Sequence, residues 1–354
     1  MTNLISEEGI RDFLNASSAE AAFIQKDENC RYISGFTGSD SFLFLTREGN
    51  YLLTDSRYTE QAKKETHNFE IVNCPGKVPV EVARLCQKHG VKHLAVEPVL
   101  SYKMYLAMHE AAKNVVFTFC DADALRQIKS EEELAAIRQA CRLSDEGFRQ
   151  MLPQLKAGKT EAQMRSILEC AMLEAGSEGK SFDTIVASGE RSAYPHGTAT
   201  DKMIENGDLV TFDFGAIYKG YHSDITRTVA VGTLTDRQRY LYDSVLECLL
   251  LIEKTMKVGE KACDVDKRAR DFLKTKELDS YFTHALGHSV GLEIHEAPVL
   301  APRDHSVLKA GMTETVEPGV YIPGIGGVRI EDTVVLEKNG ISVYTLFPKD
   351  FVSV

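Results

Sequence analysis

The sequence predicts an α/β (α+β) protein of two domains, and three observations carry that prediction. The chain has 354 residues, more than a single hydrophobic core usually holds. In its first third, short apolar runs typical of buried strands alternate with segments of helical periodicity. Further along, acids and histidines are embedded in apolar or glycine-rich sequence. We therefore expect an α/β domain over residues 1–122 and a second domain over residues 123–354, which contains these acids and histidines.

The first domain is expected to be a sheet covered by helices. The predicted strands are 21–24, 41–46, 51–54, 93–97 and 115–119, and the predicted helices are 78–88 and 102–114. Such alternation is typical of a sheet with helices on its faces. Because this region contains no glycine-rich phosphate-binding loop, the sequence does not support nucleotide binding.

The second domain is expected to begin with two capped helices. Ser130 and Glu133 have the spacing of a capping box, which predicts a helix to about Leu155, and Thr160 caps a second helix that ends near Ala175. A strand over 182–188, a hairpin over 208–231 and helices over 236–256 and 263–276 follow. From residue 284 onward the pattern predicts strands and loops.

Composition excludes several classes of function. A net charge of −11 and a pI near 5.5 argue against nucleic acid or an anionic membrane as partner. No apolar run approaches the roughly 20 residues of a membrane span. The first residues have neither the basic nor the apolar region of a secretory signal. The eight cysteines are scattered without a C-x-x-C pair, which favours reduced, buried thiols. We therefore expect a cytoplasmic enzyme.

Five side chains form an oxygen-rich set with one imidazole. They are Asp213, Asp224, His288, Glu317 and Glu331. Charged groups seldom lie in apolar sequence unless they are paired or bind a metal. The two aspartates belong to the predicted hairpin, where unneutralised carboxylates would repel each other; the alternative is a pair of turn aspartates facing water. The set predicts two divalent metal ions, Mn²⁺ first, with Co²⁺, Fe²⁺ or Zn²⁺ as alternatives.

Glycines flank the histidine in this set. Gly287 and Gly291 lie on either side of His288, seven residues before His295. A glycine allows close approach of the backbone, and we expect it here to approach a metal ion or a bound peptide.

The motifs resemble those of the pita-bread metallopeptidases, and in particular the Xaa-Pro aminopeptidases and prolidases. The matching motifs are Asp213-Phe-Gly, Ser223-Asp-Ile-Thr-Arg, the segment 284–296, Glu317-Pro-Gly and Arg329-Ile-Glu-Asp. The resemblance covers the whole chain, since Phe36-Thr-Gly and the stretch 53–58 resemble the smaller N-terminal domain of that group. It implies a pita-bread catalytic domain preceded by a creatinase-like α/β domain. Methionine aminopeptidases normally lack such a domain.

The resemblance also assigns the metal ligands. Asp213 would bind one metal ion, and His288 and Glu317 would bind the other. Asp224 and Glu331 would bridge both ions. Glu317 would in addition act as the general base.

Further residues receive roles from the same resemblance. His196, His284 and His295 would contact the substrate and stabilise the tetrahedral intermediate. Arg329 would orient Glu331 or the nearby histidines. The resemblance further implies a homodimer or a higher homo-oligomer, with the N-terminal domain closing over a neighbouring active site.

Two related activities fit these motifs. The leading hypothesis is an Xaa-Pro aminopeptidase, which cleaves the bond between an N-terminal residue and a following proline in peptides. The alternative is a prolidase that acts on Xaa-Pro dipeptides only. The stretch 54–58 favours the aminopeptidase. An inactive peptide-binding scaffold and a metal-free creatine-type hydrolase, both on the same fold, are disfavoured because every ligand position is filled.

Four residues depart from the pattern of the resembled group. Ser289 replaces a common glycine and is expected to narrow the space beside the neighbouring metal ligand. Glu314 places a charge in an otherwise apolar strand, and the sequence offers no explanation for it. Thr333 stands where a second acid is common. His222 is expected on the surface or in a loop, with an additional hydrogen-bond donor behind the metal ligands as the alternative.

Overall fold

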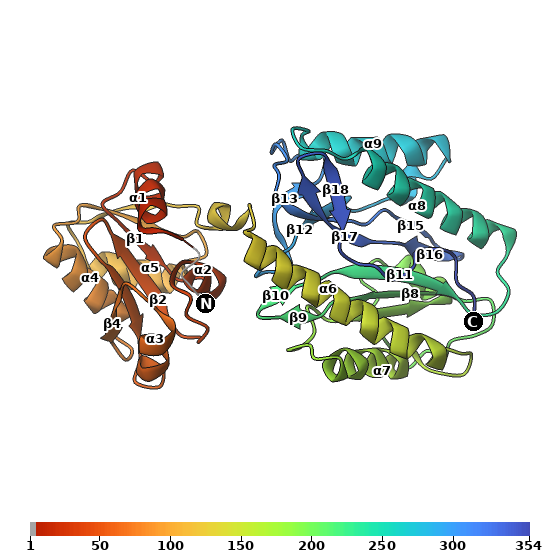
Figure 1. The fold of residues 1–354 in the computed structure, drawn as a ribbon, viewed down its shortest axis with the longest axis horizontal. Coiled ribbons are helices and arrows are strands. Elements are labelled where there is room, and N and C mark those ends of the chain that lie inside the picture. The colour runs from red at the N-terminus through yellow and green to blue at the C-terminus, as the bar shows by residue number, and fades with distance from the viewer. Residues whose placement is uncertain (1–4) are drawn as a thin grey trace. The chain divides into compact units, whose positions relative to one another are not determined.

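The computed structural model describes residues 5–354 and confirms the mixed α/β class (Figure 1). The chain forms two compact units that meet between Arg126 and Gln127. A short 3-10 helix, η1 (Asp123–Arg126), ends the first unit. The two units share neither a sheet nor a hydrophobic core among the described residues, so each is described by itself.

Unit 1 is built on one six-stranded mixed sheet. Its strands are β1 (Ala21–Ile24), β2 (Phe42–Thr46), β3 (Asn50–Thr54), β4 (Phe69–Asn73), β5 (His93–Val96) and β6 (Val116–Phe119), in the order β4-β3-β2-β1-β5-β6. Strand β2 is antiparallel to both of its neighbours, and the other pairs are parallel. The helices are α1 (Glu7–Ala16), α2 (Asp27–Ser34), α3 (Thr59–Glu65), α4 (Val78–Lys88) and α5 (Tyr102–Ala111).

Every strand and helix predicted in unit 1 is present within a few residues of its expected bounds. Strand β4 and helices α1 to α3 were not predicted. Strand β4 is the edge strand next to β3, and its residues are half-buried or exposed, so it lacks the apolar run that marked the central strands. Helices α2 and α3 have only eight and seven residues, too few for a clear helical period.

Unit 2 places its strands between two pairs of helices (Figure 1). One pair is α6 (Glu131–Met151) with α7 (Glu161–Glu174), and the other is α8 (Asp236–Thr255) with α9 (Ala262–Thr275). Short 3-10 helices are η2 (Leu152–Gln154), η3 (Gly189–Ala193) and η4 (Asp279–Tyr281). The capping box predicted for Ser130 and Glu133 is confirmed, as is the cap predicted at Thr160. Thr160 also forms a capping box, with Gln163 as its partner.

The strands of unit 2 form small antiparallel sheets. They are β7 (Ile185–Ser188), β8 (Leu209–Phe214), β9 (Ile217–Tyr218), β10 (Tyr221–His222), β11 (Ile225–Ala230), β12 (Gly287–Ser289), β13 (Glu296–Leu300), β14 (Thr313–Val316), β15 (Gly319–Ile322), β16 (Gly326–Arg329), β17 (Asp332–Glu337) and β18 (Gly340–Val343). Two sheets have three strands, in the orders β11-β8-β7 and β14-β17-β18. Three hairpins, β9–β10, β12–β13 and β15–β16, complete the unit.

Two separate hydrophobic cores stabilise unit 2. The core under α6 and α7 is centred on Phe148, whose ring stacks on Phe214 at 5.1 Å and meets Phe347 edge-on at 4.7 Å. The core under α8 and α9 is mostly aliphatic and includes side chains from β14, β16 and β17. Strands that face these cores must turn their alternate side chains the other way.

Two expectations from composition can be compared with the structure. No helix in residues 5–354 is long and apolar enough to cross a membrane. All eight cysteines are free; Cys170 is exposed, Cys263 is half-buried and the other six are buried.

Glu314 lies in the core under α8 and α9. It is paired with Val334 and lies between Met312 and Val316, which belong to that core. Its side chain is fully buried, and neither carboxylate oxygen has a hydrogen-bond partner among the described residues. Burial raises the pKa of Glu314 well above its usual range, which favours the protonated form.

Replacing Glu314 by leucine is expected to stabilise the protein by on the order of 1–3 kcal/mol, because a buried polar group without a partner costs about that much. The raised pKa makes the cost of Glu314 grow as the pH rises, so the gain should be larger at pH 8 than at pH 6. Urea midpoints of the two proteins measure it. Glu314→Gln, which keeps a polar group of similar size, should gain less; an unchanged midpoint for Glu314→Leu would contradict the account.

Candidate metal centre

Strand alternation directs polar side chains into the space between the two cores. On β8, Phe212 and Phe214 pack against α6 and α7, so Asp213 points to the opposite face. Glu331 follows β16 and comes directly after Ile330, which packs in the other core. The sequence of these strands therefore brings two acids together from opposite sides of the unit.

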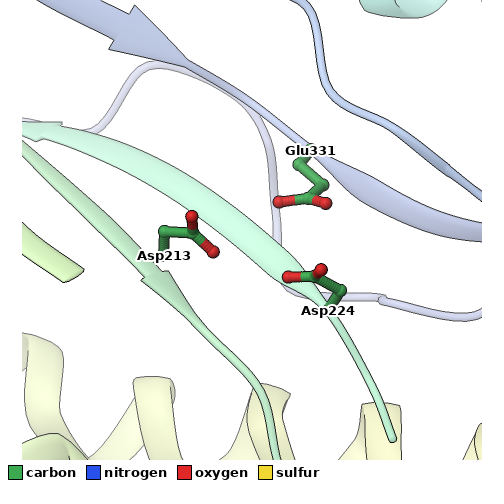
Figure 2. A group of neighbouring side chains, drawn as sticks. All are labelled: Asp213, Asp224 and Glu331. Atoms are coloured by element: carbon green, nitrogen blue, oxygen red, sulfur yellow. The ribbon is translucent and has the colours of Figure 1, made fainter. Parts of the chain in front are cut away.

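Three carboxylates converge at this place (Figure 2). Ligand oxygens of Asp213, Asp224 and Glu331 all lie within 4.8 Å of one another. Thr226 of β11 pairs with Asp213, and Asp224 lies two residues before Thr226, so both aspartates point to the same side of the hairpin. One oxygen of each aspartate, Oδ1, is buried and has no hydrogen-bond partner within the described part of the chain. Such oxygens are suited to a cation.

The pKa values of the acids in this cluster also indicate a site for a cation. Burial raises the pKa of Asp224 well above its usual range, and the neighbouring Glu331 raises it further. Burial and the charge of Glu317 have the same effect on the pKa of Glu331. Burial also raises the pKa of Glu317, to about 8. Without a cation the cluster therefore retains protons, and a divalent ion is the simplest group that would neutralise it.

His288 completes the donor set. Its Nε2 lies 3.6 Å from Asp224 Oδ2 and 3.5 Å from Glu317 Oε1. Its Nδ1 lies 3.2 Å from the carbonyl oxygen of Ser289, and because a carbonyl can only accept, Nδ1 carries the proton. Burial lowers the pKa of His288 to about 4. The ring is therefore neutral and presents the lone pair of Nε2 to the carboxylates, as a metal ligand must.

The flanking glycines have a different role from the one expected. A Cβ on Gly287 would lie 1.9 Å from the carbonyl oxygen of Thr315, on the neighbouring strand β14. A Cβ on Gly291 would lie 2.6 Å from a carboxylate oxygen of Glu296. These glycines therefore allow close packing within the chain, and the expected approach to a metal ion or a peptide is not needed to explain them.

Arg329 is held against the cluster by a buried network. One nitrogen lies 2.5 Å from Asp213 Oδ2, and another donates to the hydroxyl of Tyr321 at 2.6 Å. Its Nε donates to Thr226 Oγ1, which in turn donates to Glu331 Oε2 at 2.6 Å. Arg329 thus contacts Asp213 directly and reaches Glu331 through Thr226.

His284 belongs to the same network. Its Nδ1 lies 2.7 Å from the carbonyl oxygen of Ala285, so Nε2 accepts the hydrogen bond from the hydroxyl of Tyr321, at 2.9 Å. Burial, followed by the charge of Arg329, lowers the pKa of His284 to about 4. Since both ring nitrogens are engaged, contact with a substrate would require His284 to release one partner.

All nine site residues predicted from the sequence line one cavity of about 520 Å³. They are His196, Asp213, Asp224, His284, His288, His295, Glu317, Arg329 and Glu331. His196 and His295 are exposed side chains of that cavity, and the ring of His295 meets that of His288 edge-on at 4.5 Å. The remaining wall is largely apolar and includes Phe182, Ile185, Pro195, Ile294 and Val299.

Several supporting residues were not predicted. Tyr321 joins Arg329 to His284, and no sequence signal marks it. Thr226 could have been found, since it lies on the same face as Asp224 two residues away. Thr315 donates to Glu317 Oε1 at 3.2 Å and accepts from the backbone N–H of His288.

Three of the residues that depart from the pattern of the resembled group lie outside the lining of the cavity. Ser289 is fully buried and, unlike the expectation, is not among the described residues that line the cavity. Thr333 donates to the carbonyl oxygen of Asp224 at 2.7 Å and so helps to hold the backbone of that residue. His222 is a half-buried residue of β10 whose Nδ1 lies 2.8 Å from Ser181 Oγ.

Comparison with known proteins places the chain in a family. Residues 135–338 match the metallopeptidase family M24, and residues 8–128 match the creatinase/prolidase N-terminal domain. An Xaa-Pro dipeptidase of Pyrococcus horikoshii is 38% identical over 97% of both chains. A solved Xaa-Pro dipeptidase from Bacillus anthracis has a TM-score of 0.96 at 40% identity, covering 98% of this chain and 99% of that one.

A second solved structure carries a different name. An X-Pro aminopeptidase from Thermotoga maritima has a TM-score of 0.90 at 36% identity, covering 99% of both chains. The resemblance inferred from the motifs is confirmed by these matches. The chain belongs to metallopeptidase family M24, with a creatinase/prolidase N-terminal domain in front of a pita-bread catalytic domain.

Proposed function

We propose that the protein is a metal-dependent Xaa-Pro dipeptidase, a prolidase, which hydrolyses the bond between a residue and the proline that follows it in a dipeptide. The observation that carries the proposal is the convergence of Asp213, Asp224 and Glu331 in a cavity that also holds His288 and Glu317. Relatives named Xaa-Pro dipeptidase match this chain from end to end.

The order of the two hypotheses from the sequence is reversed here. The motifs placed the aminopeptidase first, whereas relatives named dipeptidase or prolidase support the alternative better. Aminopeptidase activity on longer peptides stays the second candidate because of the likeness to the Thermotoga maritima structure. Both activities would hydrolyse the bond before proline, and both would need the same set of metal ligands.

The donor set fits two divalent metal ions, with Mn²⁺ as the first candidate. Asp213 would hold one ion, His288 and Glu317 the other, and Asp224 and Glu331 would be shared. The donors are oxygens with one neutral imidazole and no thiolate, which suits Mn²⁺, Co²⁺, Fe²⁺ or Zn²⁺. Bound there, the ions would polarise the scissile carbonyl and lower the pKa of a water molecule.

The chain's own residues supply the remaining chemistry. Glu317 would take the proton from the attacking water, as a carboxylate that lies beside that water can do. His196 and His295 reach into the cavity and would donate hydrogen bonds to the substrate as negative charge develops on its carbonyl oxygen. Arg329 would hold the Asp213 carboxylate in its orientation through their direct contact.

The size and lining of the cavity fit a small substrate. A volume of about 520 Å³ lies within the range of roughly 300–1,000 Å³ usual for small-molecule sites. The apolar wall, including Phe182 and Ile185, provides a surface on which a proline ring and an aliphatic side chain can be buried.

Mn²⁺-loaded protein is expected to hydrolyse an Xaa-Pro dipeptide and to leave an Xaa-Pro-Xaa tripeptide intact, because relatives named Xaa-Pro dipeptidase match nearly the whole chain. Chromatography of the products after equal incubation measures both reactions. Tripeptide cleavage that releases only the N-terminal residue would establish the aminopeptidase instead. Inactivity on both peptides, with metal bound, would favour the inactive scaffold.

Asp224→Asn is expected to lose both metal and activity, because a carboxylate shared between two ions is replaced by a neutral amide. His295→Ala should retain its metal while kcat falls about 10²-fold or more, as expected when a proton-transfer or hydrogen-bonding group is removed. Elemental analysis after dialysis, with kcat for the dipeptide, separates the two effects. Equal metal content in Asp224→Asn and the parent protein would contradict the ligand assignment.

The metal-free protein is expected to lose stability as the pH rises from 6.5 to 8. The pKa of Glu317 is raised to about 8 in the folded state. The stability that comes from its protonation is therefore fully present below the unfolded pKa and is lost as the pH rises through about 8. The lowered pKa of His284 and His288, about 4 in each case, affects stability only below about 6.5.

Melting temperatures in EDTA at pH 6.5 and 8 test this dependence. Saturating Mn²⁺ should remove the decline, because metal binding requires the ionised carboxylates. Glu317→Gln should reduce the decline in EDTA. A metal-free melting temperature that rises over this range would show that the carboxylates are not protonated in the folded protein.

A further inference from the structure

The hairpin that carries two of the site histidines has a polar rear face. His288 and His295 line the cavity, while their sequence neighbours Ser289 and Glu296 are paired across β12 and β13. Both neighbours are buried, and neither is among the described residues that line the cavity. The hairpin therefore holds its histidines in front and a hydroxyl and a carboxylate behind.

Lys129 binds both rear groups. Its Nζ lies 3.0 Å from Ser289 Oγ and 3.0 Å from Glu296 Oε2. It donates a third hydrogen bond to the carbonyl oxygen of Gln127, at 3.4 Å. The side chain of Lys129 is 1% exposed and that of Glu296 is 4% exposed. A fully enclosed ammonium thus contacts the immediate neighbours of both histidines.

The same network extends to the strand that precedes Glu317. Ser289 Oγ also lies 3.2 Å from Thr313 Oγ1, at the start of β14. Glu296 Oε1 accepts from the backbone N–H of Glu293, inside the turn between the histidines. Lys129 therefore connects the turn, the hairpin and β14, three segments that are distant from it in sequence.

We propose that Lys129 is a positioning residue, which holds His288 toward the carboxylates and His295 toward the substrate by fixing Ser289 and Glu296. Its removal would leave the Glu296 carboxylate buried without this cation, and such a group moves to find another partner or water. Because the hairpin is short, that movement is transmitted to both rings, and a displacement of about 1 Å at a reacting group can cost roughly 10²-fold in rate.

Lys129→Met, which keeps the length of the side chain and removes its charge, tests the proposal. At saturating metal we expect kcat for an Xaa-Pro dipeptide to fall about 10–100-fold. KM should change much less, and the visible absorption spectrum of the Co²⁺-loaded protein should shift as His288 moves. The turnover measurement rests on the proposed function, whereas the Co²⁺ spectrum does not. A failure of the positioning proposal can therefore be told apart from a failure of the proposed function.

A double variant separates positioning from stability. Lys129→Met/Glu296→Leu removes the buried carboxylate together with its cation and should have the parental melting temperature, while its kcat and Co²⁺ spectrum stay altered. Arg268→Met is a matched control, because Arg268 also bridges a carboxylate and a hydroxyl, Glu260 and Thr255, away from the cavity; it should leave both readouts unchanged. Parental kcat and spectrum in the double variant, or in Lys129→Met itself, would overturn the proposal.

Discussion

The repulsion between buried carboxylates is the constraint on which the catalytic unit depends. Two like charges about 4 Å apart repel by about 4 kcal/mol at an effective dielectric constant near 20, and here three acids lie within 4.8 Å of one another. The pKa values of Asp224 and Glu331 rise because burial and repulsion both oppose ionisation. A protein keeps such a cluster only if its backbone is fixed by other interactions and if a cation is available to it.

The backbone is fixed chiefly by Arg227, the last charged residue of the Ser223-Asp-Ile-Thr-Arg motif. Its guanidinium donates to the carbonyl oxygen of Glu331 at 2.5 Å and to that of Thr226 at 2.9 Å, and it pairs with Asp332 at 2.8 Å. Lys349 also contacts Asp332. This arginine therefore joins the strand that follows Asp224 to the segment that carries Glu331. The motif thus contains both a proposed metal ligand, Asp224, and the arginine that holds the segment of a second one.

The sequence predicted the features that depend on local periodicity, and it missed those that depend on register between distant strands. Alternation along one hairpin was enough to place Asp213 and Asp224 on the same side. By contrast, the position of Tyr321 between Arg329 and His284 depends on a contact between β15 and His284, which lies 37 residues away in sequence. The contact of Lys129 with Ser289 spans 160 residues of chain, and no spacing rule predicts it.

The choice between the two peptidase activities depends on charge and length beyond the proline. In the proposed enzyme, four carboxylates would balance two divalent ions, while the histidines with lowered pKa stay neutral and Arg329 leaves the centre with a net positive charge. A dipeptide brings its own carboxylate into this field, whereas a longer peptide presents a neutral amide there and needs an open path past the proline. The donor set is common to both activities, which explains why motifs that identify the metal ligands do not by themselves rank the substrates.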